Sequence, residues 1–366
     1  MASATGSRGV LVGVPARHGI VPPYLLQRIA TLEDPRFQVA SHAALRSLQS
    51  DHPLRILGRS PNPPARPGFL PGEGGEAGTP TRAISDAGGQ ETLPGRLVRS
   101  EGQTPTGDDA VNEAYDGLGA TYALYWDAFG RNSIDGRGLP LDASVHYGQR
   151  YDNAFWDGSR MVFGDGDGEV FTRFTISMSV IGHELTHGVT QFSANLTYQG
   201  QSGALNESVS DVFGVLVEQH VKHQTSAEAT WLIGEGLFTP AVQGRALRSM
   251  KAPGTAYDDD VLGKDPQPDS MAGYVKTSDD YGGVHLNSGI PNRAFYLVAH
   301  ALGGHAWEAP GQIWYDTLTG ASLAPDVDFA GFARATLEAA ARRFGGDSRE
   351  RSATGDAWTT VGVDVT

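Results

Sequence analysis

Two histidines four residues apart, with a glutamate directly after the first, form the most reactive combination in the chain, His183-Glu184-Leu185-Thr186-His187. Residues 175–182 before it are mostly apolar and contain no proline, so we expect a helix that continues through the motif. On a helix, residues i and i+4 share a face, and both imidazoles would converge on one point. This arrangement is typical of zinc hydrolases, whose glutamate takes a proton from water on the metal. The alternative is a solvated helix face with two ordinary histidines.

A catalytic zinc ion also needs a third protein ligand and an open fourth position for water. Glu207 lies 20 residues beyond His187, within a second helix that we expect over 203–221. Asp211 follows one helical turn later and can accept the outer N–H of a ligand imidazole, which orients that ring. Taken alone, both acids also fit the solvated face of a helix.

Composition and charge exclude several classes of protein. The chain has 366 residues, enough for two or three domains, and no cysteine, so a metal would have to be held by histidine and carboxylate. A net charge of −14 argues against nucleic-acid binding. No apolar run is long enough to span a membrane. Residues 1–19 lack the features of a signal peptide, so we expect a cytoplasmic precursor or export by a non-standard route.

The first 60 residues differ from the rest in charge. They carry seven arginines, no lysine and three acids, a net of +4, so the remainder carries −18 and could attract them. Helices expected at 24–30 and 37–48 form a small head, residues 1–59. Residues 60–81 are rich in proline and glycine, as in an exposed, cleavable linker. A head on such a linker suggests a propeptide, and the alternative is a spacer between permanent domains.

The body of the chain changes pattern along its length. Strands are expected around 144–147, 154–156 and 161–163, after a helix over 108–129, whereas the C-terminal half is mostly helical. Gly164-Asp165-Gly166-Asp167-Gly168 lacks the distal acidic ligand of an EF-hand. We therefore expect a tight hairpin turn there and keep a calcium loop as the alternative.

Six motifs in the same order resemble the thermolysin family of zinc endopeptidases over about residues 82–366. Besides the histidine motif and Asn206-Glu207-x3-Asp211, the matching features are Asn153 to Gly158, Tyr198, Arg248 and Asp280 to Gly289. The resemblance implies an α+β, thermolysin-like fold with two lobes. Residues 82–176 would form a β-rich N-terminal lobe and residues 177–366 an α-helical C-terminal lobe, with the zinc helix in the cleft between them.

The head resembles the short propeptide of the protealysin-like branch of this family. The matching residues are His18, Pro22-Pro23-Tyr24-Leu25-Leu26 and Arg28-Ile29-Ala30. This implies an inactive precursor whose head covers the cleft, as an intramolecular inhibitor, until it is removed. The sequence leaves open whether the head also assists folding, where it is cut, what the physiological substrate is and whether a separate protein inhibitor exists.

The resemblance also implies which residues carry the reaction. His183, His187 and Glu207 would hold one catalytic Zn²⁺, with Glu184 as the base. Tyr198 and His285 would stabilise the developing oxyanion.

Other matched residues would support these groups or hold the substrate. Asp211 would orient a zinc ligand and Asp280 would orient His285, whereas Asn153, Ala154 and Arg248 would hold the substrate backbone. The pocket for the residue after the scissile bond would be formed by five apolar residues, Phe174, Val180, Ile233, Leu237 and Leu247. We therefore predict cleavage before Leu, Phe, Ile or Val. The alternative for these residues is plain core packing, above all for Phe174 and Leu237.

The chain departs from the family at its paired calcium site. Two of the four acids have counterparts in Glu218 and Glu235, but the other two positions hold Ser179 and Thr230. Arg245 stands at a further calcium position. Two carboxylates are weak support for a calcium ion, so we expect structural Ca²⁺ to be absent or reduced.

Two other functions compete with this interpretation. A non-catalytic binding protein on the same scaffold would have lost the base or a ligand, and a zinc exopeptidase would need a site for a free terminus. Glu184, Tyr198 and His285 are all present, and no motif for a free terminus is visible. We therefore expect a neutral zinc metalloendopeptidase that is a monomer and acts on proteins and peptides, without nucleic-acid or membrane partners.

Overall fold

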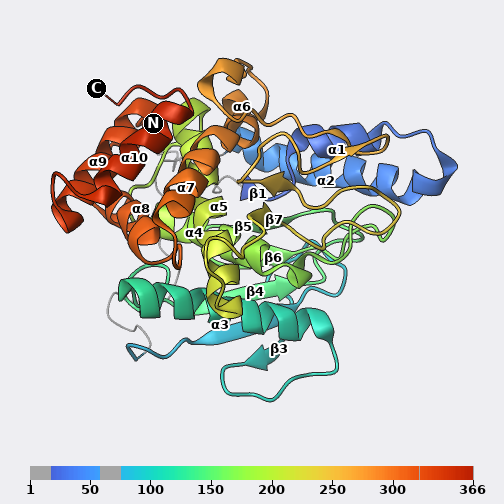
Figure 1. Ribbon diagram of the computed structural model, residues 1–366. Coiled ribbons are helices and arrows are strands. Elements are labelled where there is room, and N and C mark those ends of the chain that lie inside the picture. The colour runs from blue at the N-terminus through green and yellow to red at the C-terminus, as the bar shows by residue number, and fades with distance from the viewer. Residues whose placement is uncertain (1–17, 58–75, 321, 366) are drawn as a thin grey trace, which may run out of the picture.

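The structure is a computed structural model that describes residues 18–57, 76–320 and 322–365. It has two lobes: a sheet with one long helix against it, and a group of helices at the C-terminal end (Figure 1). Two further helices run between the lobes (Figure 1). Most of the expected linker, residues 60–75, lies outside the described ranges.

A six-stranded sheet forms the N-terminal lobe. Its strands are β1 (His18–Gly19), β2 (Arg82–Asp86), β3 (Arg96–Ser100), β4 (Leu141–Val145), β5 (Ala154–Trp156) and β6 (Met161–Phe163). Their order is β1-β5-β6-β4-β2-β3, in which β4 is parallel to both of its neighbours and the other pairs are antiparallel. The head thus supplies the outermost strand, β1, which pairs with β5. The strands expected at 154–156 and 161–163 are confirmed. The strand expected at 144–147 is β4, which begins earlier and ends at Val145. It ends there because His146 has a φ of 55°, outside the range of a strand.

The helix packed on this sheet is α3 (Asp109–Phe129), as predicted. It begins at Asp108, whose side chain accepts hydrogen bonds from the N–H groups of Ala110 and Val111, and it ends at Gly130 in the left-handed conformation. The apolar face formed by Val111, Tyr115, Leu118 and Tyr122 is buried. The cap carboxylate also bonds to His146 (Nε2 to Oδ2, 2.9 Å), which ties the helix start to the end of β4.

The glycine-rich loop at 164–168 forms a turn but no hairpin. Asp167 Oδ1 accepts from the N–H groups of Glu169 and Val170, each at 2.6 Å, and Oδ2 accepts from Phe171 N at 3.1 Å. These bonds close the turn. The chain beyond the turn pairs through Phe171 with Phe238 and not with the strand before the turn. The expected hairpin is therefore wrong.

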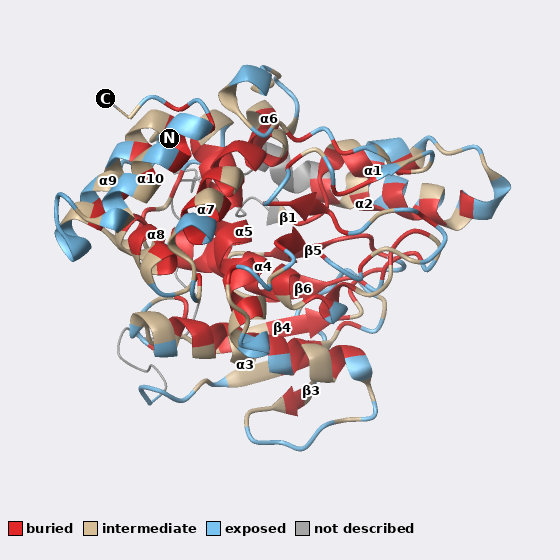
Figure 2. Ribbon diagram, viewed as in Figure 1, coloured by how far each residue is buried: buried red, intermediate tan, exposed pale blue. Residues whose placement is uncertain are grey.

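Two buried helices, α4 (Met178–Gln191) and α5 (Gly200–Lys222), lie at the centre of the molecule (Figures 1 and 2). Glycines at their crossing allow the backbones to approach closely. A Cβ on Gly214 would lie 2.5 Å from Ser179 O, and one on Gly182 would lie 3.0 Å from Gly214 Cα. Any larger residue would force the helices apart. This contact sets where α5 stands relative to the histidines of α4.

The C-terminal lobe is a group of helices: α6 (Asp280–Asn287), α7 (Gly289–Leu302), α8 (Ala309–Thr319), α9 (Phe329–Phe344) and α10 (Arg349–Thr360). Its core contains Trp314 and Trp358, which are fully buried and stacked with their ring centroids 6.1 Å apart. Phe332 of α9 packs edge-on against Trp358. Trp358 therefore lies at the centre of this core. Short strand pairs, β7 (Leu232–Ile233) with β8 (Arg248–Ser249) and β9 (Asp258–Asp259) with β10 (Gly263–Lys264), lie between α5 and this lobe in the chain.

The head contains two helices, α1 (Pro23–Ala30) and α2 (Gln38–Leu57), packed against each other. Pro22 and Pro23 start α1 directly after β1, and a 3₁₀ turn (Pro35–Phe37) starts α2. The buried side of α1, which includes Leu25, Leu26 and Ile29, joins the main hydrophobic core. Within the described part of the head, α1 is therefore packed into the body.

None of the helices in the described ranges combines the length and the apolar character needed to cross a bilayer.

Candidate active site

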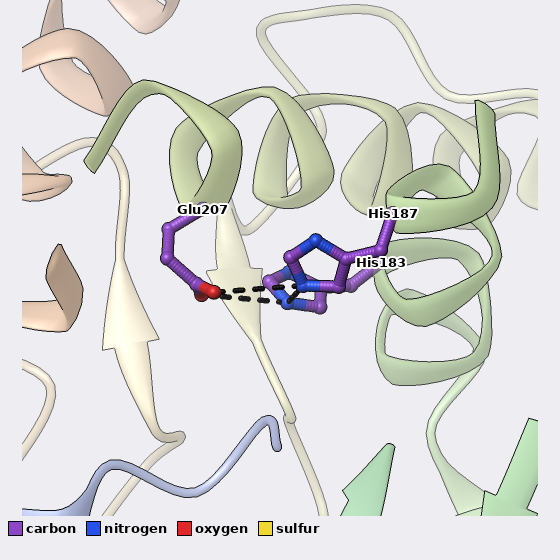
Figure 3. A group of neighbouring side chains, drawn as sticks. All are labelled: His183, His187 and Glu207. Atoms are coloured by element: carbon purple, nitrogen blue, oxygen red, sulfur yellow. Dashed lines mark hydrogen bonds and ion pairs between the residues drawn. The ribbon is translucent and has the colours of Figure 1, made fainter. Parts of the chain in front are cut away.

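Helix α4 places His183 and His187 one turn apart with their rings turned toward one point (Figure 3). Their Nε2 atoms are 3.1 Å apart. Glu207 of α5 lies opposite, with Oε2 at 3.5 Å from His183 Nε2 and Oε1 at 3.5 Å from His187 Nε2. All three side chains are almost completely buried. The sequence-predicted ligands therefore meet at one point, as a metal site requires.

The donor set fits a zinc ion. Two imidazole nitrogens and a carboxylate oxygen lie within 4.8 Å of one another, which no other group of three such residues achieves in the described ranges. Glu207 Oε2 is buried and accepts no hydrogen bond from the part of the chain that the structure describes. A buried, unbonded carboxylate oxygen is costly unless a cation neutralises it. These three residues would hold the zinc ion.

The outer nitrogen of each ligand imidazole has its own acceptor. His183 Nδ1 lies 2.7 Å from Asp211 Oδ1, and His187 Nδ1 lies 2.8 Å from Asn206 Oδ1 and 3.1 Å from Ser210 Oγ. These contacts leave Nε2 of both rings as the metal-facing atom. Asp211 was predicted in this role. Asn206 and Ser210 were not, although their spacing of four residues on α5 places them on one face, as it does Glu207 and Asp211.

Glu184 lies on the same helix beside this cluster and is completely buried. Its Oε2 accepts a hydrogen bond from the N–H of Trp156 at 2.9 Å, whereas Oε1 has no donor among the described residues. Burial raises the pKa of Glu184 well above its ordinary value, and the nearby Glu207 carboxylate raises it further. The free oxygen can therefore act on a proton next to the metal position.

Tyr198 and His285 flank Glu207 on the other side. The Tyr198 hydroxyl donates to Glu207 Oε1 and lies 3.4 Å from His285 Nε2. Burial raises the pKa of Tyr198 well above its ordinary value, so the hydroxyl keeps its proton. His285 Nδ1 lies 2.7 Å from Asp280 Oδ1. Burial opposes the charged form of His285, but the carboxylates of Asp280 and Glu207 outweigh it and raise its pKa.

Residues 19–21 of the head lie against this site as an extended segment. Ile20 N donates to Ala154 O at 3.1 Å, and Val21 N donates to Asn153 Oδ1 at 2.9 Å. Arg248 Nη1 donates to Ile20 O at 3.0 Å, and His285 Nε2 lies 3.2 Å from Gly19 O. Asn153, Ala154 and Arg248, which were predicted to hold the substrate backbone, thus each bond to a backbone N–H or C=O group of this segment.

The five residues predicted to form the pocket after the scissile bond are all buried, in the same apolar cluster as Ile20. Ile233 pairs with Arg248 across β7 and β8, and Leu247 precedes that arginine, which places both near the Ile20 carbonyl. Phe174 also packs against Phe171, with ring centroids 5.6 Å apart, so it serves the core as well. The role of the five as a pocket stays a prediction.

Comparisons with known proteins agree with this geometry. Residues 79–191 match the family model described as "Thermolysin metallopeptidase, catalytic domain", and residues 194–363 match "Thermolysin metallopeptidase, alpha-helical domain". An "Extracellular metalloprotease" of Pectobacterium carotovorum subsp. carotovorum is 52% identical over 346 residues, 94% of this chain and 96% of that protein. "Protease PrtS" of Photorhabdus sp. (strain Az29) is 46% identical over 354 residues, 95% of this chain and 92% of that protein.

A solved structure of similar sequence also matches. It is described as "Precursor of Protealysin, Metalloproteinase from Serratia proteamaculans". The TM-score is 0.86 at 52% identity, and the match covers 95% of this chain and 100% of that one.

Replacing Asp211 by Asn should weaken zinc binding by roughly 10- to 100-fold, because His183 would lose the carboxylate that orients it. It should also lower the free energy of unfolding by about 3 kcal/mol, because Arg248 would keep its charge while buried without a carboxylate partner. Competition with a chromophoric chelator and urea unfolding measure the two effects. As a control, Asp316→Asn removes an exposed ion pair with Arg343 and should change neither measurably. Unchanged zinc affinity in Asp211→Asn would contradict the assignment.

Proposed function

Since this chain belongs to the thermolysin family of zinc metalloendopeptidases, we propose that it is made as a precursor whose head blocks the active site in the manner of a bound substrate. A zinc ion held by His183, His187 and Glu207 would polarise the substrate carbonyl. It would also lower the pKa of water, so that the water can lose a proton and attack at neutral pH. The other groups around the site have separate tasks, which follow from their positions.

Glu184 takes the proton from the attacking water and returns protons to the leaving amine. Its unbonded Oε1 and its raised pKa support this role, because a carboxylate with a raised pKa is a stronger base. Tyr198 O–H and the Nε2–H of His285 donate to the oxygen on which negative charge develops. Asp280 keeps His285 in the orientation and charge state for this donation.

The binding of residues 19–21 supports this proposal more than any other observation. Gly19 O faces His285, Ile20 O accepts from Arg248, and Val21 N donates to Asn153. The segment therefore runs antiparallel to β5 with the Gly19–Ile20 peptide bond next to the catalytic groups. A substrate chain in the same register would place its scissile bond there, so the head and a substrate would compete for the same donors and acceptors.

The same register suggests the preference of the enzyme. Ile20 follows the peptide bond next to the catalytic groups, and its side chain is completely buried. Complete burial of a side chain of this size stabilises binding by about 1.5–3 kcal/mol. A substrate with Leu, Ile, Phe or Val after its scissile bond would gain the same burial. We expect the precursor to be a monomer, which stays a prediction.

The residues at the family's calcium positions bond to protein groups, which take the place that a calcium ion would have. Glu218 pairs with Lys222, Ser179 Oγ accepts from Gly234 N at 3.1 Å, and Thr230 Oγ1 donates to Glu235 at 3.3 Å. These contacts support the inference that structural calcium is absent or reduced.

Replacing Glu184 by Gln should lower turnover of casein by roughly 10²- to 10⁴-fold and prevent self-removal of the head, while zinc content stays at one ion per chain. Casein digestion, gel electrophoresis of the precursor and zinc analysis make the three measurements. Glu338→Gln, an exposed position on α9, is the matched control and should retain full activity. Substantial turnover by the Glu184→Gln protein would show that another group is the base.

Replacing Ile20 by Asp should loosen the head, because the new carboxylate would be buried without a partner. Freshly purified precursor should then hydrolyse a short peptide about tenfold faster or more than the unchanged precursor. Leu45→Asp is the control, since Leu45 is also in the head but is 46% exposed. If both variants stay as inactive as the parent, the head does not block the site through this segment.

Digestion of a peptide library by the processed enzyme should yield products whose new N-termini are Leu, Ile, Phe or Val in most cases. Burial in an apolar pocket favours these side chains by about 1–3 kcal/mol per residue over small or polar ones. Sequencing of the product mixture gives the distribution. A flat distribution would refute the pocket assignment.

Calcium should have little effect on thermal stability. Protein treated with EDTA and restored with zinc alone should melt at the same temperature, within about 2 °C, with and without millimolar calcium, because only two of the four acids of the family's paired calcium site have counterparts here. Scanning calorimetry measures this. A much higher melting temperature with calcium would overturn the inference.

A further inference from the structure

Gly19 of the head precedes the peptide bond that lies next to the catalytic groups, and it has no room for a side chain. A Cβ on Gly19 would lie 2.4 Å from Nδ2, 2.8 Å from Cγ and 3.0 Å from Oδ1 of Asn153. Non-bonded carbon atoms prefer a separation of about 3.5–4.0 Å, so either the chain or the amide of Asn153 would have to move. The φ of Gly19 is outside the left-handed region. Glycine is therefore required here by the lack of space and not by the backbone conformation.

The cost of a side chain at this position depends on whether the Asn153 amide can move. The last torsion of an asparagine side chain is broad, so hydrogen bonds and not torsional preference hold the amide. Its Oδ1 accepts from Val21 N at 2.9 Å and from Ala154 N at 3.0 Å. Its Nδ2 lies 3.3 Å from Asp51 Oδ2 and 3.5 Å from Val21 O. Three of these four contacts are made by the head.

Asp51 is the partner that holds the nitrogen end of this amide. Its contact with Nδ2 is the shorter of the two, and a carboxylate is a stronger acceptor than a backbone carbonyl. The Tyr151 hydroxyl donates to the other oxygen of Asp51 at 2.6 Å. Tyr151 is itself packed edge-on against the rings of Tyr147 and Phe155. The carboxylate therefore connects the Asn153 amide to a well-packed part of the body.

Helix α2 brings this carboxylate to the cleft. Asp51 lies one helical turn after Ser47, whose Oγ accepts from Asp152 N at 3.0 Å. Both Ser47 and Asp51 are almost fully buried, so this face of α2 is in close contact with the body. When α2 leaves, Asn153 loses Asp51 together with its two contacts to Val21. The amide is then free to turn away from the position that it occupies in the precursor.

We propose that Asn153 determines which residue fits before the scissile bond, and that Asp51 holds Asn153 where only glycine fits. In the precursor the head meets this restriction because it carries Gly19 at that position. Once the head has left, the amide turns and larger residues fit before the bond to be cut. The proposal rests on the proposed function of the head as the group that blocks the site. It adds the residue pair that limits which chain can occupy the cleft while α2 is seated.

A double-substitution cycle within the head tests the link from Asp51 through Asn153 to Gly19. Four full-length, zinc-loaded precursors carry Glu184→Gln, which prevents self-cleavage, with the unchanged head, Gly19→Ala, Asp51→Ala or both. The probe is a fluorophore-labelled hydroxamate with a leucine-like side chain. It binds the metal and the pocket after the scissile bond, and it places nothing at the position of Gly19.

Fluorescence anisotropy gives the apparent Kd of the probe for each precursor. Both substitutions are in the head, so the affinity of the uncovered cleft is the same in all four proteins. Differences in apparent Kd therefore report only how often the head is away from the cleft.

Gly19→Ala alone should lower the apparent Kd of the probe by about tenfold or more, because the added methyl group opposes seating of the head. In the presence of Asp51→Ala, the same substitution should lower it by less than about threefold, because the Asn153 amide can then move aside. Glu33→Ala, which removes an exposed acid of the head, is the matched control and should leave the effect of Gly19→Ala at its full size.

An effect of Gly19→Ala that is equally large with and without Asp51 would overturn the proposal. If Asp51→Ala alone gives the probe the affinity that it has for the Ile20→Asp precursor, the milder Asp51→Asn takes its place in the cycle. A failure of the blocking role itself would look different, because Ile20→Asp would then leave the affinity of the probe unchanged.

The processed enzyme supplies a second measurement, which does not depend on how tightly the head is held. Two short peptides that differ only in Gly or Ala before a Leu should be cut with kcat/KM values within about threefold of each other, since Asp51 no longer holds Asn153. A preference for the glycine peptide of about tenfold or more would overturn the proposal, because Asn153 would then exclude side chains without the head.

Discussion

The buried carboxylate of Asp211 is the interaction on which both halves of the site depend. Its Oδ1 lies 2.7 Å from His183 Nδ1 and accepts from Arg248 Nη2 at 2.7 Å, and its Oδ2 accepts from Arg248 Nε and Asn292 Nδ2. Burial opposes the charged form of this carboxylate, but Arg248 and His183 outweigh it, and the pKa is lowered. One side chain thus orients a metal ligand and the arginine that holds a chain in the cleft. The chemical centre and the binding subsite therefore have a fixed relative position.

This arrangement depends in turn on how closely α4 and α5 approach each other. Gly182 and Gly214 lie at their crossing, where a side chain would strike backbone atoms of the other helix. Because Asp211 and Glu207 both project from α5 toward α4, a wider separation would move them away from the histidines together. The two glycines carry no chemistry themselves, but they set the distances on which the chemistry depends.

Sequence reasoning reached some parts of the site and not others, for identifiable reasons. The pairing of His183 and His187 follows from helical spacing alone, because it is a local property. The position of Glu207 depends on how two helices pack, so its place in the sequence made it a candidate, and the resemblance to a family favoured it over a solvated helix face. The contacts of Gly19 to Val21 are made mostly by backbone atoms, which leave no trace in residue type.

The head also completes the sheet, since β1 is its outermost strand and covers β5. Removal of the head, as we propose for maturation, would therefore do more than open a pocket: it would create a free sheet edge whose N–H and C=O groups have no neighbour. Such an edge is what an extended peptide needs in order to bind, and it is also what a second protein molecule would need in order to aggregate. With only three residues in β5, the edge is long enough to hold a cleavable segment and too short to template a stable sheet between molecules.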